Sequence, residues 1–109
     1  LTAYTNGKPP TGISDYIVGK YSLLGLSKSL AVEVGKDGIT VNCISPSMTE
    51  TPLISHLPEK LKEFSASQVP IGRLARPSDI ASLALFLCSK QSDYISGENI
   101  MVSGGSIMD

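Results

Sequence analysis

SDYIVGK, residues 14–20, opens the longest helical pattern in the chain. Because an α-helix turns once every ~3.6 residues, side chains four positions apart share a face, so we expect Tyr16 and Lys20 to lie side by side. Ser14 is a candidate N-cap, and Asp15 suits the positive end of the helix dipole. An ammonium group beside a phenol favours the ionised phenol, which can exchange a proton with an alcohol or carbonyl oxygen. The spacing therefore predicts either a proton-transfer pair on a rigid element or an ordinary exposed pair of helix side chains.

The segments on either side of this pattern predict a parallel βαβ unit. Helical spacing continues over residues 15–34. Its apolar line consists of Leu23, Leu26, Leu30 and Val34. A glycine-containing turn at residues 35–38 ends the helix, and the β-rich residues 39–44 predict a buried strand. Residues 1–5 have the pattern of the end of another strand. A long helix between two short strands is the connection that parallel strands require.

A hydroxyl-rich loop at residues 45–52, bracketed by Pro46 and Pro52, follows the predicted strand. Open α/β sheets bind ligands beyond the carboxyl ends of their parallel strands, so this loop is a candidate ligand site. Residues 57–64 then show the spacing of a short amphipathic helix. Its position next to the ligand edge leaves two interpretations open, a plain surface helix or a mobile lid.

The second half of the chain predicts one more helix and one more strand. Pro77 suits the first position of a helix, with Asp79 in its first turn. Residues 80–87 are apolar nearly all round, which predicts deep burial. Residues 99–102 predict a last buried strand. The glycine-rich tail at residues 103–106 does not lead from a strand into a helix, so we exclude it as a phosphate-binding loop.

Composition narrows the class of protein. The 109 residues include 41% hydrophobic and 17% charged side chains and carry a net charge of -1, which is typical of a soluble globular protein. Such a charge favours neither a nucleic acid nor an anionic membrane as partner, and no apolar run reaches the ~18 residues that span a bilayer. Cys43 and Cys88 lie in apolar runs, which predicts buried thiols in a reducing, cytoplasmic compartment. With His56 as the single histidine, we expect no metal site.

The order of the motifs resembles the C-terminal half of the short-chain dehydrogenase/reductase family. The motifs are YIVGK at residues 16–20, VNCISP at 41–46 with Thr51 after it, IGRLARPSDI at 71–80, YISG at 94–97 and VSGG at 102–105. The resemblance covers essentially the whole chain and is greatest to compact members such as the 3-oxoacyl-acyl-carrier-protein reductases. It implies an α/β fold, the C-terminal part of a Rossmann-like doubly wound parallel sheet with three strands, two long helices and a short lid helix.

The resemblance also assigns roles to particular residues. Residues 1–109 would be the catalytic half of a single Rossmann-fold dehydrogenase domain whose N-terminal dinucleotide-binding half is absent. Tyr16 would be the acid/base, and Lys20 would assist it and hydrogen-bond the nicotinamide ribose. The nicotinamide end of the cofactor would be held by Pro46, Ser47, Thr49 and Thr51. The substrate-orienting serine of the family falls at or near Ala3, and Thr2 is its candidate replacement.

The implied function is that of an NAD(P)-dependent oxidoreductase, which transfers a hydride between the cofactor and a carbonyl or alcohol substrate. The residues that choose NAD or NADP belong to the absent half, and without the pyrophosphate site we expect the isolated piece to be inactive. Leu53, Ile54 and Leu57 favour a hydrophobic or acyl substrate. The family also implies a homo-oligomer. Ser47, where the family usually has glycine, and Ala3 leave open the alternative of a non-catalytic interaction or scaffold module that kept the fold.

Overall fold

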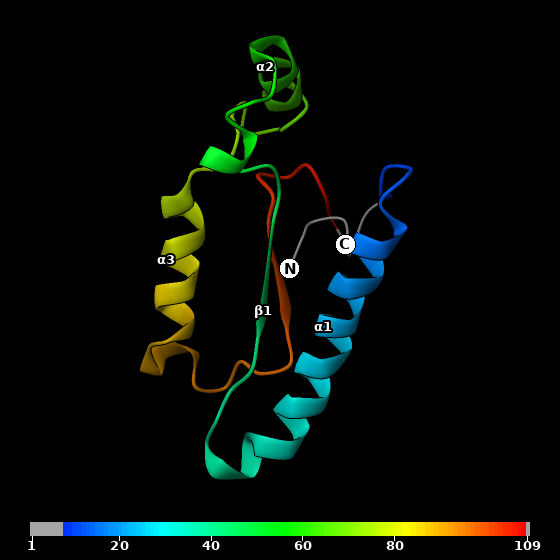
Figure 1. The fold of residues 1–109 in the computed structure, drawn as a ribbon. Helices are drawn as coiled ribbons and strands as arrows, with labels where there is room; N and C mark the ends of the chain where they lie inside the picture. The colour runs from blue at the N-terminus through cyan, green and yellow to red at the C-terminus, as the bar shows by residue number, and fades with distance from the viewer. Residues whose placement is uncertain (1–7, 109) are drawn as a thin grey trace.

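Two parallel strands with a helix on each side form the centre of the structure (Figure 1). The computed structural model describes residues 8–108. Its helices and strands are α1 (Ser14–Val34), β1 (Cys43–Pro46), α2 (Glu59–Ser67), α3 (Pro77–Leu87) and β2 (Asn99–Val102). Three short 3-10 turns within this range are η2 (Gly35–Asp37), η3 (Pro52–Ile54) and η4 (Lys90–Ser92). The strand expected at residues 1–5, the third strand of the predicted sheet, lies outside the described residues.

β1 and β2 pair side by side in the same direction. Cys43 lies opposite Asn99 at one end of the ladder, and Pro46 lies opposite Val102 at the other. Parallel neighbours cannot be joined by a tight turn, so the chain crosses from β1 to β2 through α2 and α3. The predicted positions of both strands are therefore confirmed in outline, but β1 begins later than the predicted residue 39.

The residues just before β1 are held mostly by side-chain hydrogen bonds, together with one backbone bond from the amide of Gly97 to the carbonyl oxygen of Val41 at 2.7 Å. Asn42 Nδ2 donates to the carbonyl oxygen of Ile95 at 2.7 Å, and Asn42 Oδ1 accepts from the amide of Glu98 at 3.1 Å. The amide of Val41 donates to Ser96 Oγ at 3.1 Å. These bonds attach the stretch to the turn that precedes β2, so regular pairing starts only after Asn42.

α1 runs antiparallel to the strands, so its first turn lies at the end of the sheet where β1 and β2 finish (Figure 1). Its half-buried side is made of residues that recur at helical spacing, namely Ile17, Lys20, Leu24, Ser27, Leu30, Ala31 and Val34. Contact with the strands is made through small groups. Cys43 Sγ donates to Ser27 Oγ at 2.9 Å, and a Cβ built on Gly97 would lie 3.6 Å from the Cβ of Ala31. These short contacts decide which face of α1 is turned inward.

The predicted apolar line of α1 is wrong in part. Leu30 and Val34 are half-buried, as expected, but Leu23 and Leu26 are exposed. The reason is the close approach at Ser27, which turns the face with smaller residues toward the strands. Helical spacing alone could not separate these two neighbouring faces, because both carry leucines.

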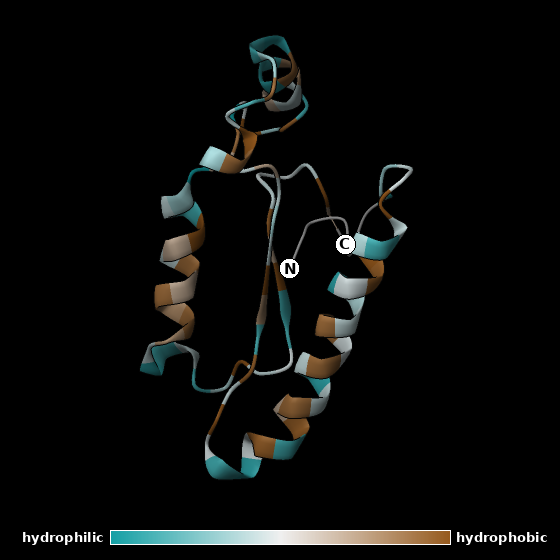
Figure 2. Cartoon of the chain, viewed as in Figure 1, coloured by the Kyte–Doolittle hydropathy of each residue, from teal (hydrophilic) through white to brown (hydrophobic). Residues whose placement is uncertain are grey.

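α3 is much less buried than its sequence predicts. None of its residues is buried, and Leu85 is 74% exposed, although hydrophobic bands run along its length (Figure 2). A helix is buried only as far as its neighbours cover it, and within residues 8–108 α3 packs mainly against β1 and the turn that follows the helix. Cys88, just after α3, is exposed for the same reason, which corrects the prediction of a buried thiol, whereas Cys43 in β1 is buried.

Candidate active site

Tyr16 and Lys20 lie together on the first turns of α1. Lys20 Nζ is 5.3 Å from the centre of the Tyr16 ring, which is within cation–π distance. Lys20 is half-buried on the side that faces the strands, and Tyr16 is exposed. The predicted side-by-side arrangement is confirmed. The predicted cap is wrong, because Ile13 occupies the N-cap position, Ser14 is already the first helical residue, and no side chain caps this end.

A loop of residues 46–51, the 46–51 loop, leaves β1 at the same end of the sheet as the first turn of α1 (Figure 1). The amide of Ser47 donates to the carbonyl oxygen of Val102 at 3.1 Å, so the start of the loop stays attached to β2. Thr49 Oγ1 donates to the carbonyl oxygen of Ser47 at 2.9 Å. The candidate cofactor residues therefore occupy one short segment with a defined conformation.

A second segment, residues 73–76, pairs with the 46–51 loop. The amide of Ala75 donates to the carbonyl oxygen of Met48 at 3.1 Å, and the amide of Glu50 donates to the carbonyl oxygen of Ala75 at 2.8 Å. These two bonds make a parallel bridge between Thr49 and Ala75. Within the described part of the chain, the amides of Met48 and Thr49 donate to no residue. These two adjacent N–H groups are therefore candidates for bonds to a ligand.

The free groups of the loop fit the nicotinamide end of a dinucleotide. A primary carboxamide has one carbonyl oxygen that accepts and an NH₂ group that donates. The amides of Met48 and Thr49 match the oxygen. Thr51 precedes η3, and its side chain makes no capping bond there, so its hydroxyl is a further candidate. The donor set of the 46–51 loop is therefore compatible with the cofactor that the sequence motifs imply.

A cavity of about 450 Å³ opens beside the 46–51 loop. It is lined mostly by apolar side chains, including Met48, Phe64, Val69, Leu74 and Ile107, together with Ser47. Its size falls within the range of small-molecule sites. Phe64 belongs to α2, so this helix forms one wall of the cavity. That position suits the lid interpretation of α2, and the surface-helix interpretation stays open beside it.

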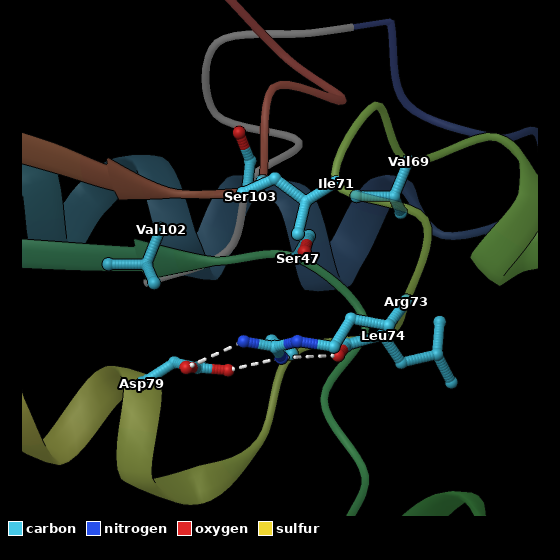
Figure 3. Close-up of a pocket in the computed structure, with 10 residues that line it drawn as sticks. Ser47, Val69, Ile71, Arg73, Leu74, Asp79, Val102 and Ser103 are labelled. Carbon is cyan, nitrogen blue, oxygen red and sulfur yellow. Dashed lines mark hydrogen bonds and ion pairs between the residues drawn. The ribbon is translucent and has the colours of Figure 1, made fainter.

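A smaller cavity of about 210 Å³ shares Ser47 and Leu74 with the first and holds an ion pair that we did not predict (Figure 3). Arg73 Nη1 and Nη2 donate to the two carboxylate oxygens of Asp79 at 2.7 and 3.0 Å. The hydrogen bond from Arg73 and then that from the amide of Arg76 lower the pKa of Asp79 from 3.8 to about 2. The same pairing raises the pKa of Arg73.

The sequence did contain a signal for this pair, because Arg73 shortly precedes Asp79, an aspartate in the first turn of α3. Side chains six positions apart do not meet in regular structure. They meet here because residues 73–76 bend back toward the helix before α3 begins. Only the course of the backbone between Arg73 and Asp79 reveals the contact.

Some predictions fall on residues that the structure does not describe. Thr2 and Ala3 lie outside the described residues, so the substrate-orienting hydroxyl stays a prediction. Among residues 8–108, no three or more His, Cys, Asp or Glu side chains are grouped so as to hold a metal ion. No helix in the described part of the chain is both long enough and apolar enough to cross a bilayer.

These features define a class of protein, because parallel strands with helices on both faces and a ligand loop at their carboxyl ends form part of a Rossmann-like doubly wound α/β fold. Comparison with known proteins agrees. The model of a family described as enoyl-(acyl carrier protein) reductase matches residues 2–106. The chain belongs to the short-chain dehydrogenase/reductase family of oxidoreductases.

Individual relatives match only part of their own length. The (2S)-[(R)-hydroxy(phenyl)methyl]succinyl-CoA dehydrogenase subunit BbsD of Thauera aromatica is 40% identical over 94 residues, which is 86% of this chain and 38% of that relative. The 3-oxoacyl-[acyl-carrier-protein] reductase FabG of Chlamydia muridarum is 43% identical over 94 residues, again 86% of this chain and 38% of the relative. The chain therefore spans about two fifths of the length of these relatives.

Solved structures show the same fold. The 3-oxoacyl-[acyl-carrier protein] reductase of Brucella melitensis superposes with a TM-score of 0.90 at 28% identity, over 99% of this chain and 40% of that one. A reductase from the same organism with bound NAD superposes with a TM-score of 0.86 at 28% identity, over 99% of this chain and 39% of that one. Both are similar to this chain over nearly all of its length.

Proposed function

We propose that residues 1–109 form the catalytic half of an NAD(P)-dependent oxidoreductase, and that the dinucleotide-binding half of the same Rossmann domain lies outside this sequence. Membership of the family supports this function, as does the bound NAD in a Brucella melitensis relative. The observation that carries the proposal is the Tyr16–Lys20 pair, with 5.3 Å between the ammonium nitrogen and the ring centre. The pair begins α1 at the end of the sheet from which the 46–51 loop emerges (Figure 1).

The residues of this chain divide the chemistry between them. When bound, the nicotinamide donates or accepts the hydride. Tyr16 gives its phenolic proton to a carbonyl oxygen during reduction and takes a proton from the hydroxyl during oxidation. The ammonium group of Lys20 stabilises the phenolate and hydrogen-bonds the nicotinamide ribose. Thr2 would orient the substrate oxygen, and the amides of Met48 and Thr49 together with the Thr51 hydroxyl would hold the carboxamide.

The walls of the cavity of about 450 Å³ beside the 46–51 loop support a hydrophobic or acyl substrate. Its lining is mostly apolar, and α2 contributes Phe64 to it. A turnover screen of the full-length dehydrogenase with NADH and with NADPH, against keto-acyl, keto-steroid and sugar substrates, tests this. We expect keto-acyl compounds to turn over fastest. Preference for a polar sugar would contradict the assignment.

Tyr16→Phe in the full-length dehydrogenase tests the role of the phenol. The substitution removes only the hydroxyl group, so we expect turnover to fall by about 10²-fold or more, the size of a general acid/base contribution, while cofactor binding is kept. Tyr94→Phe is the matched control, because Tyr94 is fully exposed and has no role in the proposal. Equal turnover in wild type and Tyr16→Phe would remove Tyr16 from the mechanism.

One observation favours a second candidate, a non-catalytic scaffold module with the same fold. Ser47 places a side chain at the wall of both cavities, where the family usually has glycine. A full-length protein that binds neither NADH nor NADPH would favour the scaffold. An intact glycine-rich loop in the preceding half, together with measurable cofactor binding, would favour the enzyme.

The exposed apolar residues of α1 support a homo-oligomer. Val18, Leu23, Leu26 and Val32 are all exposed on this helix in the described structure. We propose that a second copy of the full-length protein covers part of this surface. Sedimentation velocity tests it, and a monodisperse monomer at micromolar concentration would contradict it.

A further inference from the structure

The Arg73–Asp79 pair helps to hold residues 73–76 against the start of α3. The Asp79 carboxylate accepts from Arg73 Nη1 and Nη2 at 2.7 and 3.0 Å, and from the amide of Arg76 at 2.7 Å. Arg73 Nη1 also donates to the carbonyl oxygen of Leu74 at 2.9 Å. Three donors on one carboxylate therefore hold residues 73–76 against the first turn of α3, and Figure 3 shows the two from Arg73.

The segment so held is the one that pairs with the 46–51 loop. Ala75 lies between Arg73 and Arg76, and its amide and carbonyl groups bond Met48 and Glu50 at 3.1 and 2.8 Å. The Leu74 side chain beside it is 4% exposed and lines both cavities. A displacement of residues 73–76 would therefore move the middle of the loop.

Asp79 is the main charged partner of Arg73 in the described part of the chain. The preceding residue, Gly72, has φ +82°, a left-handed conformation that glycine adopts freely, so the backbone on that side is permissive. The charge of Glu50, itself in the 46–51 loop, makes a smaller contribution to the raised pKa of Arg73. Asp79 is the anion that bonds the guanidinium directly.

We propose that Arg73 and Asp79 are positioning residues that hold the 46–51 loop in the conformation that binds the nicotinamide carboxamide, through the Thr49–Ala75 bridge. The inference rests on the proposed function, since it assigns the loop a cofactor to bind. The proposal gives neither side chain a contact with the reacting atoms. The pair is also a poor candidate for a purely structural role, because the Arg73 and Asp79 side chains are 41% and 31% exposed and such pairs contribute little to global stability.

The proposal predicts a specific pattern in the full-length dehydrogenase. Arg73→Gln and Asp79→Asn should raise the Kd for NADH or NADPH roughly tenfold, as expected when two loop hydrogen bonds to the carboxamide are weakened. The KM of the second substrate should change much less. Hydrogen exchange at the amides of Glu50 and Ala75 should accelerate in both variants even without cofactor, whereas the melting temperature should change little.

Ser92→Ala is the matched control for a general loosening of α3. Ser92 is buried, and its Oγ lies 3.0, 3.0 and 2.9 Å from the carbonyl oxygens of Phe86, Leu87 and Ser89 at the other end of the helix. This variant should lower the melting temperature and leave cofactor affinity and the exchange of Glu50 and Ala75 unchanged.

The outcomes separate the two proposals. Wild type that binds neither NADH nor NADPH overturns the proposed function, and the positioning role falls with it. Wild type that binds cofactor while Arg73→Gln and Asp79→Asn bind equally well overturns the positioning role alone. Equal losses of affinity in these variants and in Ser92→Ala would assign the effect to the stability of α3, which also overturns it. The expected result is a loss of affinity and faster loop exchange confined to the Arg73 and Asp79 variants.

Discussion

Gly104→Ala is expected to be a costly small substitution, because Gly104 combines a restricted backbone conformation with a close neighbour. Its φ is +61°, in the left-handed region, and a Cβ built on it would lie 2.7 Å from Val69 Cγ1. Val69 is β-branched, so its side chain cannot rotate away freely. Gly104 also accepts a hydrogen bond from the amide of Ile71 at 3.3 Å, so a shift of the backbone there would disturb this contact.

The magnitude has two parts. A left-handed conformation costs an L-residue roughly 1–2 kcal/mol. Adding a methyl group to a packed contact costs about 1–3 kcal/mol. Gly104→Ala should therefore lower the free energy of unfolding by about 2–5 kcal/mol. Gly38→Ala is the matched control, because Gly38 has φ +73° but a Cβ added to it would have no heavy atom within 4 Å. Only the first part, about 1–2 kcal/mol, applies to it.

Urea denaturation of the full-length dehydrogenase without cofactor measures both values. Each substitution is Gly→Ala, so the effect on the entropy of the unfolded chain is the same and cancels in the comparison. The difference between the two variants should be about 1–3 kcal/mol, which is the contribution of the Val69 contact. Equal losses of stability would refute the reasoning, because they would show that Val69 does not press on the backbone at Gly104.

Three further experiments follow from the structure. Asn42→Ala removes two of the bonds that attach the stretch before β1 to the turn before β2, so it should cost about 1–3 kcal/mol in urea denaturation, and no change would contradict the role of Asn42. Asp79 has a folded-state pKa of about 2, below its ordinary 3.8, so its ion pair stabilises the fold above about pH 4 and this contribution is lost as the pH falls toward 2. An NMR titration of the Asp79 carboxyl should follow this lowered pKa, and an ordinary pKa near 3.8 would argue against the pair. Ser47→Gly removes a side chain from the wall of both cavities, so NADH fluorescence titration should show tighter binding, and an unchanged affinity would count against contact between the cofactor and this part of the loop.

The local features of the chain could be predicted because short-range rules determine them. Pro77 does begin α3, Asp79 does lie in its first turn, and residues 99–102 are β2, as expected. Tyr16 and Lys20 lie together because helical geometry places residues four apart on one face. The position of the loop at the carboxyl end of β1 follows from the parallel connection in the same way.

The failed predictions all concern how a helix or strand contacts the rest of the chain. The burial expected for α3 and Cys88 depends on neighbours that cover them, and composition cannot say how far that cover extends. The Ser14 cap failed by one residue, because the start of a helix is decided by the chain that enters it as much as by the capping side chain.

By itself, the sequence determined the order of the helices and strands, the family, and the adjacency of Tyr16 and Lys20, because each depends on periodicity, on proline and glycine, or on motifs contiguous in the chain. Only the tertiary structure decided which face of α1 turns inward, and only it revealed the Thr49–Ala75 bridge and the Arg73–Asp79 pair. Those contacts depend on ångström-scale distances between backbone segments that the chain brings together only after it has folded.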